Sequence, residues 1–260
     1  MPEFKSVAEA KPLGGLRLVL TGGVPGPWGE SAKGVFHAKG IPHVPVLQSG
    51  GHPNPELLEW TGHENAPQAV FEDEPARTGW AEILFLAERI EPKPSLLPDD
   101  PADRALMFGL AHEICGEQGF GWSRRLMMLH GTLSLGLSDD NPLVQIMTRL
   151  GNRYGYTPER GELAAERAAS ILRMLAARLD AQRQRGSRFF VGDALTAVDI
   201  YWAAFCGIVD PLPPELCPMN DMMRQQYLAK DPVLKSALAK SLLEHRDAIY
   251  RDHLELPIDL

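Results

Sequence analysis

The sequence predicts an α/β region followed by an all-helical region. Three observations lead to this prediction. Residues up to about 90 alternate strand candidates with amphipathic helices, residues 92–101 contain four prolines, and the residues after 102 show only helical spacing of apolar side chains. A proline-rich stretch of this kind is typical of a stiff linker. We therefore divide the chain into residues 1–90, of which about the first 14 are an extension, a linker at 91–101, and a helical domain at 102–260.

The first region reads as a β-α-β unit followed by a β-α unit. Strands are expected at 16–20, 43–47 and 68–71, a short helical turn at 54–60, and helices at 30–39 and 80–89. Gly40 suits the end of the first helix. Pro45 interrupts the second strand, and a proline cannot donate to a central ladder, so this strand is expected at an edge of the sheet or at a bulge.

The second region contains two clear signals for the start of a helix. Thr157 followed by Pro158 predicts a helix that runs to about residue 185. Thr196 and Asp199 have the spacing of a capping box, with flanking apolar residues spaced as a hydrophobic staple. We interpret this second motif as a folding device, and we expect the Thr196→Ala change to cost about 1 kcal/mol. Residues 210–218, with four prolines, are expected to be a loop.

Composition excludes several classes of function. The net charge of −8 and the pI near 5.5 argue against nucleic-acid binding, which needs a basic face. No apolar run approaches the roughly 20 residues of a membrane span, and the first residues do not resemble a signal peptide. Three cysteines without CxxC spacing indicate neither a disulfide framework nor a zinc site. A cytoplasmic protein that binds neither membranes nor nucleic acid is expected.

Residues 18–40 read as a strand, a glycine-rich turn and a helix. The turn has neither of the glycine patterns that cradle nucleotide phosphates. Gly26 and Gly29 expose backbone amides at a helix start, where an anion or a thiolate is stabilised. Trp28 lies beside them, and two interpretations stay open for it: it covers a hydrophobic patch, or it forms a wall of a ligand pocket.

Four segments together resemble the glutathione S-transferase superfamily. Residues 26–41 are similar to its first loop and helix, 65–69 to the turn before its third strand, 79–88 to the helix that follows, and 192–199 to its Gly-Asp-x-Leu-Thr-x-x-Asp motif. The resemblance covers nearly the whole chain. It implies a thioredoxin-like N-terminal domain followed by an all-α C-terminal domain, a cis Ala66–Pro67 bond, glutathione as the cofactor, and a homodimer.

The resemblance also implies two groups of site residues. The glutathione-binding positions are Trp28, Ala66, Pro67, Gly79 and Trp80. The positions that line a second-substrate pocket are Cys115, Phe120, Trp122 and Arg124. His112 and Cys115 lie one helical turn apart, but no third metal ligand is near them, so no metal site is expected.

The chain departs from the family at the positions that carry chemistry. Gly26 occupies the nucleophile-activating position, and glycine has no side chain to offer a thiol. Gly79 and Trp80 stand where the family holds the γ-glutamyl carboxylate, and neither supplies a hydroxyl. The catalytic residue is therefore unknown, and Thr21 and Ser31 are the nearby hydroxyl candidates.

Three functions are compatible with the sequence. The first is a divergent glutathione S-transferase that conjugates or isomerises a small apolar substrate. The second is a non-catalytic binding or scaffolding protein with the same fold, and the third is an enzyme that uses another cofactor in the same cleft. Weak glutathione binding is expected, because each lost hydrogen bond to a charged group costs roughly 1.5–3 kcal/mol. The substrate itself is not indicated.

Overall fold

The computed structural model describes residues 3–260, and its N-terminal part is built on a three-stranded sheet. The central strand β1 (Leu16–Thr21) pairs in parallel with β2 (Val44–Gln48) and antiparallel with β3 (Gln68–Phe71). The edge position expected for β2 from Pro45 is confirmed. In the N-terminal extension, the backbone of Lys5 forms hydrogen bonds with β2, of 2.9 Å to Pro45 and 3.0 Å to Leu47. The extension therefore adds a single β-bridge to the sheet alongside β2.

Four helices belong to this part: α1 (Val7–Ala10), α2 (Pro27–Ala38), α3 (Pro55–Thr61) and α4 (Trp80–Ile90). Helix α2 begins three residues before the predicted start. Gly26 is extended at φ −68° and Pro27 takes the first helical position, where its missing N–H costs nothing. The Ala66–Pro67 peptide bond is cis, as predicted.

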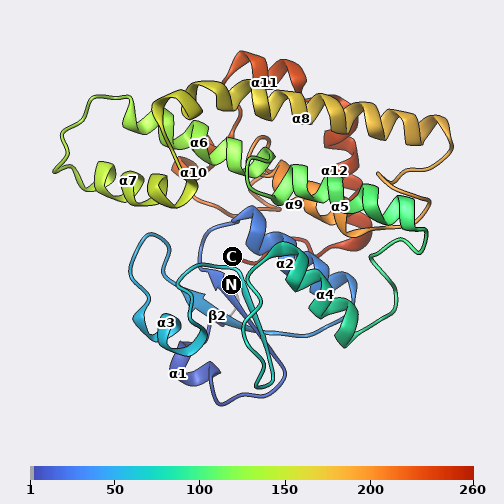
Figure 1. Cartoon of the computed structure of the whole chain (residues 1–260), viewed down its shortest axis with the longest axis horizontal. Helices are drawn as coiled ribbons and strands as arrows, with labels where there is room; N and C mark the ends of the chain where they lie inside the picture. Colours follow the sequence, from blue (N-terminus) through green and yellow to red (C-terminus); the bar gives the residue numbers. More distant parts are fainter. Residues whose placement is uncertain (1–2) are drawn as a thin grey trace.

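The rest of the described chain is helical. It contains α5 (Pro101–Cys115), α6 (Phe120–Leu133), α7 (Pro142–Tyr154), α8 (Pro158–Gln184), α9 (Ala197–Cys206), α10 (Asp221–Tyr227), α11 (Pro232–Ala237) and α12 (Lys240–His253). The predicted N-cap of α8 is confirmed, since the Thr157 hydroxyl accepts from the Arg160 N–H at 3.2 Å. Figure 1 shows α8 as the long helix that spans the helical layer above the sheet. The α/β and all-helical fold predicted from the sequence is therefore confirmed.

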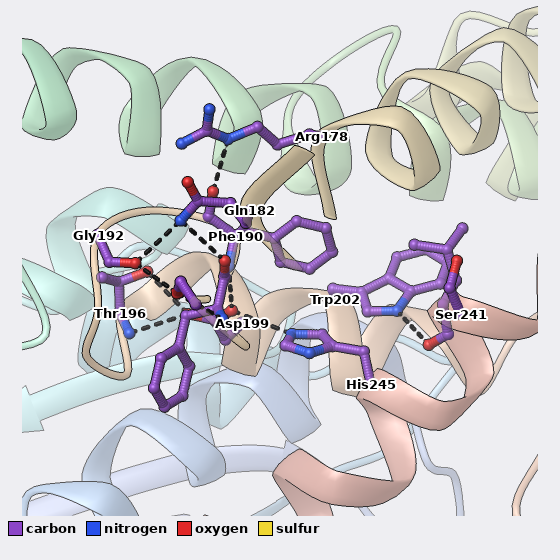
Figure 2. A network of polar contacts seen from close by, with 12 residues as sticks. Arg178, Gln182, Phe190, Gly192, Thr196, Asp199, Trp202, Ser241 and His245 are labelled. Atoms are coloured by element: carbon purple, nitrogen blue, oxygen red, sulfur yellow. Dashed lines mark hydrogen bonds and ion pairs between the residues drawn. The ribbon is translucent and has the colours of Figure 1, made fainter. Parts of the chain in front are cut away.

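The predicted Thr196/Asp199 capping box is present at the start of α9, and the Asp199 carboxylate is its main acceptor (Figure 2). The Thr196 hydroxyl does not accept from the helix; it donates to the Asp199 carboxylate at 3.0 Å. That carboxylate also accepts from the backbone N–H groups of Thr196 at 3.0 Å and Phe190 at 2.9 Å, and it lies 3.0 Å from His245 Nε2. Asp199 is fully buried. The cap is therefore centred on Asp199 rather than on Thr196, because the buried carboxylate can accept from several donors at once.

The two parts of the chain share one core. Helix α2 packs against α9, and a single cluster of buried side chains extends from β1 and α2 to α8 and α9. The C-terminal segment returns to α2, where Lys33 Nζ donates to the Asp259 carbonyl at 2.6 Å; Figure 1 places the C-terminal end near the junction. This shared core runs across the predicted linker at residues 91–101. The domain boundaries there therefore stay a prediction. Between residues 3 and 260, no helix has both the length and the apolar content that a membrane crossing requires.

Candidate functional site

A cavity of about 750 Å³ lies between the sheet-containing part and the helical part. One wall comes from the end of β1, the start of α2 and the turn after β2, at residues 20–33 and 48–51. The opposite wall comes from α6, α7 and residues 225–231, and the C-terminal residues 259–260 complete the lining. A cavity of this size accommodates a small organic ligand.

The start of α2 supplies backbone donors to the cavity. Gly26 and Gly29 both line it, and Gly26 is the N-cap with no side chain to satisfy the helix. Glu30 is the first residue whose N–H reaches a helical acceptor, the Gly26 carbonyl at 2.9 Å. Helix geometry leaves the N–H groups of Trp28 and Gly29 without an intrahelical partner. This end of the cavity therefore favours an anionic group.

The two hydroxyl candidates lie in different surroundings. Thr21 lines the cavity, and its hydroxyl donates to Gln48 Oε1 at 2.6 Å. Ser31 is buried, and its hydroxyl donates to the Pro27 carbonyl at 2.7 Å. Ser31 is not among the residues that line the cavity. Of the two hydroxyl groups, the one of Thr21 is therefore the one placed to contact a molecule that enters the cavity.

Trp28 combines both interpretations left open by the sequence. Its indole N–H donates to the Cys115 carbonyl on α5 at 2.9 Å, and its ring meets Phe205 of α9 edge-on at 5.0 Å. The same side chain lines the cavity. Trp28 therefore covers the packed junction between the two parts and forms a wall of the cavity.

The positions expected to hold the γ-glutamyl end lie apart from this cavity. Trp80 packs against Phe108 and Tyr201, with ring centroids 6.1 and 5.7 Å away. The backbone N–H groups of Gly79 and Thr78 donate to the Glu82 carboxylate at 2.9 and 3.1 Å. These hydrogen bonds, above all the one from Gly79, lower the pKa of Glu82. A negative charge of the chain itself thus occupies the helix start that would receive a substrate carboxylate.

The cis-proline turn is divided between two surroundings. Ala66 lines the large cavity, together with the start of α2. Pro67 instead contacts a much smaller void among Ser31, Trp80 and Tyr201. Of the five predicted glutathione-binding positions, Trp28 and Ala66 are therefore brought together at the cavity, and Pro67, Gly79 and Trp80 lie outside its lining.

The predicted second-substrate positions are likewise divided. Arg124 lines the cavity. Phe120 is fully buried against Trp202, and Trp122 donates its indole N–H to the Tyr154 carbonyl at 2.9 Å. Cys115 is also buried, and burial raises the pKa of its thiol well above the ordinary value, so the thiol stays protonated. Phe120 and Cys115 contribute to the core because they project toward the packed face of their helices.

Sequence reasoning did not assign the apolar residues of the cavity wall. They come from α6 and α7 and include Met127, Met128, Ile146, Met147 and Leu150. The signal that the sequence offers for this wall is the strong amphipathicity of α7. In the structure, Gly151 is the one residue of α7 that is buried. An amphipathic helix with an uncovered apolar face is typical of a binding wall or an interface.

Comparison with known proteins finds a family match in the helical part of the chain. Residues 158–240 match the family described as glutathione S-transferase, C-terminal domain. No curated protein sequence matches the chain. The chain is similar in structure to a glutathione S-transferase domain-containing protein from Marinobacter aquaeolei VT8, with 17% identity, a TM-score of 0.62, and coverage of 91% of this chain and 98% of that chain.

Two further solved structures show the same likeness. Glutathione transferase Omega 3C from Trametes versicolor has 16% identity and a TM-score of 0.57, with 95% of this chain and 89% of that chain covered. Rice GST1, solved in complex with glutathione, has 18% identity and a TM-score of 0.57, with 93% and 92% covered. Identities this low establish the fold and leave activity open. Residues 158–240 therefore match the C-terminal domain of the glutathione S-transferases, and the described chain shares the fold of the glutathione S-transferases with which it was compared.

Proposed function

We propose that this chain is a divergent glutathione S-transferase that binds glutathione weakly and conjugates or isomerises a small apolar substrate. The observation that supports this proposal is the cavity itself. It joins the free amides of the α2 start and the Ala66 turn to the apolar face of α6 and α7, so a thiol and an apolar molecule fit side by side. Holding two reactants in contact is a large part of catalysis for bimolecular reactions.

The mechanism that this geometry supports relies on backbone groups. The N–H groups of Trp28 and Gly29 and the α2 helix dipole would favour the thiolate form of glutathione at the start of α2. Gly26 adds no hydroxyl there, so activation is weaker than with a side-chain donor. Met128 and Leu150 exclude water from the neighbouring space and orient the apolar substrate against the sulfur.

Titration of glutathione by calorimetry tests the proposal. We expect a dissociation constant near the millimolar range, because two hydrogen bonds to the γ-glutamyl end are missing at roughly 1.5–3 kcal/mol each. Glu82→Gln should tighten binding by several-fold, since glutamine keeps a capping oxygen and removes the negative charge. Glu162→Gln, on the exposed side of α8, is the matched control and should change nothing. Tight binding that Glu82→Gln leaves unaltered would contradict the placement of the γ-glutamyl end.

A second function is favoured by the same two features of the site. The bare Gly26 position and the Glu82 carboxylate at the α4 start both argue against thiol chemistry. They favour a binding or scaffolding protein with this fold. If the native protein and the Gly26→Ser variant both fail to bind or react with any thiol, this alternative replaces the first.

We further propose that the protein is a homodimer in a reducing, cytoplasmic compartment. Phe85 on α4 is 46% exposed and stacks on Phe108 of α5 at 5.5 Å, with the Arg104 guanidinium over both rings. An exposed aromatic ring stacked on a partly buried one is typical of an interface. The three cysteines are buried and unpaired, which suits a reducing compartment. Light scattering should show a dimer for the native chain and a monomer for Phe85→Ser; an exposed Leu163→Ser change is the control.

A further inference from the structure

The region between α2, the turn at Pro67 and the start of α4 contains almost no free space. The void there has a volume of about 20 Å³, which is room for roughly one water molecule. Trp80 forms one of its walls, and the Trp80 ring packs edge-on against Tyr201, with 5.7 Å between the ring centroids. A γ-glutamyl group is many times larger than this void. The large cavity, by contrast, reaches the cis-proline turn only as far as Ala66.

The start of α4 also carries a negative charge of its own. Glu82 Oε2 accepts from the N–H groups of Gly79 at 2.9 Å and Thr78 at 3.1 Å. The hydrogen bond from Gly79 is the largest cause of the lowered pKa of Glu82, so the carboxylate is ionised at neutral pH. A second carboxylate at this helix start would be repelled, because two like charges a few ångströms apart disfavour each other.

The cations beside Glu82 are paired with another carboxylate. Arg77 and Arg89 lie with Glu82 along an open groove on α4, which shares no lining residue with the large cavity. Both guanidinium groups form ion pairs with Glu74, at 3.3 and 2.6 Å. The two arginines and the two glutamates together carry no net charge, so these four side chains offer no excess cation to the carboxylate of a substrate.

The part of the cavity that suits a cysteine residue is unobstructed. Its lining at the start of α2 and beside the cis-proline turn is uncharged and consists of Thr21, Gly26, Gly29, Gln48 and Ala66. The two charged residues of α2 that reach the same wall, Glu30 and Lys33, form an ion pair with each other at 3.1 Å. This end of the cavity therefore accommodates a cysteine whose amine carries a neutral group.

From these observations we infer that the preferred thiol co-substrate of this protein is a cysteine derivative without a γ-glutamyl carboxylate. Its sulfur lies at the start of α2, and the acyl group on its cysteine amine is small and uncharged. This inference rests on the proposed function, whose thiol site it uses, and it names the class of thiol that the site prefers. Glutathione is the poorer substrate, because its γ-glutamyl end meets the Glu82 carboxylate and the Trp80 ring.

A matched pair of thiols tests the inference on the native protein. They are glutathione and N-acetylcysteinylglycine, in which an acetyl group replaces the γ-glutamyl group and the rest is unchanged. With a chlorinated dinitrobenzene, the sulfur forms a bond to the ring carbon, chloride leaves with the electron pair of the C–Cl bond, and the thiol proton passes to solvent. After subtraction of the uncatalysed rate, we expect kcat/KM for the acetyl compound to exceed that for glutathione by about threefold or more. If glutathione reacts as fast or faster, the inference is wrong.

Two variants then locate the preference. Glu82→Gln should raise kcat/KM for glutathione by about threefold or more and leave the acetyl compound within about twofold, since only glutathione brings a second carboxylate to α4. Glu162→Gln, at an exposed residue of α8, removes the same charge elsewhere and should change neither value. If Glu82→Gln raises both thiols equally, or if Glu162→Gln acts as strongly as Glu82→Gln, the α4 carboxylate does not discriminate and the inference is wrong.

The same assay separates this inference from the proposed function. If neither thiol reacts above the uncatalysed rate, with the native chain or with Gly26→Ser, the transferase proposal falls and the inference falls with it. If both thiols react and glutathione is the better one, the transferase proposal stands and this inference alone falls. If the acetyl compound reacts and glutathione does not, the inference stands and glutathione is removed from the proposed function.

Discussion

The Gly26 position has room for the side chain that the site lacks. A Cβ at residue 26 would meet nothing within 4 Å, and φ is −68°, a conformation open to any residue. We predict that Gly26→Ser raises the rate of glutathione conjugation to a chlorinated nitroaromatic by about tenfold or more, since one well-placed donor to a developing anion contributes that much. The rate is followed by absorbance at saturating electrophile.

Gly26→Ala is the matched control for this prediction, because it adds the Cβ without the hydroxyl. If the alanine variant reacts as fast as the serine variant, the sulfur does not lie at the start of α2. A change in the melting temperature alone, with no change in rate, would lead to the same conclusion.

His43 makes stability depend on pH in a defined window. Burial, assisted by the nearby Lys33 charge, lowers the pKa of His43 from 6.5 to about 4. The unfolded chain therefore binds a proton between pH 6.5 and 4 that the folded chain does not, so stability is lost as pH falls through this window. This residue accounts for a loss of up to about 3 kcal/mol in the free energy of unfolding.

Urea unfolding at pH 7, 5.5 and 4.5 measures this effect. His43→Gln should flatten the pH dependence, and His52→Gln, at an exposed histidine, should preserve it. If the unfolding free energies of the native chain and of His43→Gln change with pH in the same way, the imidazole is solvated in the folded protein.

At the scale of elements, the start of α9 depends on one carboxylate. Asp199 accepts from the N–H groups of Phe190 and Thr196 and from the Thr196 hydroxyl (Figure 2). Thr196→Ala removes one of these donors, and we predict a loss of about 1 kcal/mol. Asp199→Ala leaves buried donors unsatisfied and should cost about 3 kcal/mol or more.

Chemical denaturation of the two variants tests this order. Thr157→Ala removes the exposed cap of α8 and is the control for an ordinary N-cap, at about 0.5–1 kcal/mol. Equal losses of unfolding free energy for Thr196→Ala and Asp199→Ala would show that the threonine hydroxyl is as important to the cap as the carboxylate.

At the scale of the whole molecule, Gly34 sets the distance between the two parts. A Cβ at residue 34 of α2 would lie 2.7 Å from Ile200 Cγ2 on α9 and 3.2 Å from Leu254 Cδ2. Ile200 is fully buried, so relief of this contact requires the packing between α2 and α9 to shift. We therefore predict that Gly34→Ala destabilises the protein by about 1–3 kcal/mol, the usual cost of overpacking, despite the better helix propensity of alanine.

Gly109→Ala on α5 is the matched control, because its Cβ would meet nothing within 4 Å. At residue 109 the substitution changes helix propensity alone, so we expect the free energy of unfolding to rise by about 0.5–1 kcal/mol. Thermal unfolding of both variants gives the comparison. If Gly34→Ala is also stabilising, α2 and α9 separate easily and the junction is not a rigid contact.

Much of the fold follows from local pattern. Pro45 placed β2 at the edge, Thr157 with Pro158 placed the start of α8, and the turn at residues 65–69 indicated the cis bond at Pro67. Each signal is complete within a few residues, because propensity, capping and turn chemistry act over that distance. The candidate site is different: Trp28 and Arg124 were assigned to separate groups, and the structure brings both to one cavity.

The sequence by itself determined the order of the elements, the resemblance to the glutathione S-transferases, and the absence of a side chain at residue 26. These depend on local spacing and on residue identity. Only the tertiary structure decided that Glu82 occupies the start of α4, that Asp199 is the centre of the α9 cap, and that α6 and α7 turn Arg125 and Leu150 toward the start of α2. The physical reason is that burial and pairing depend on which distant element covers a face, and helical spacing alone does not specify that neighbour.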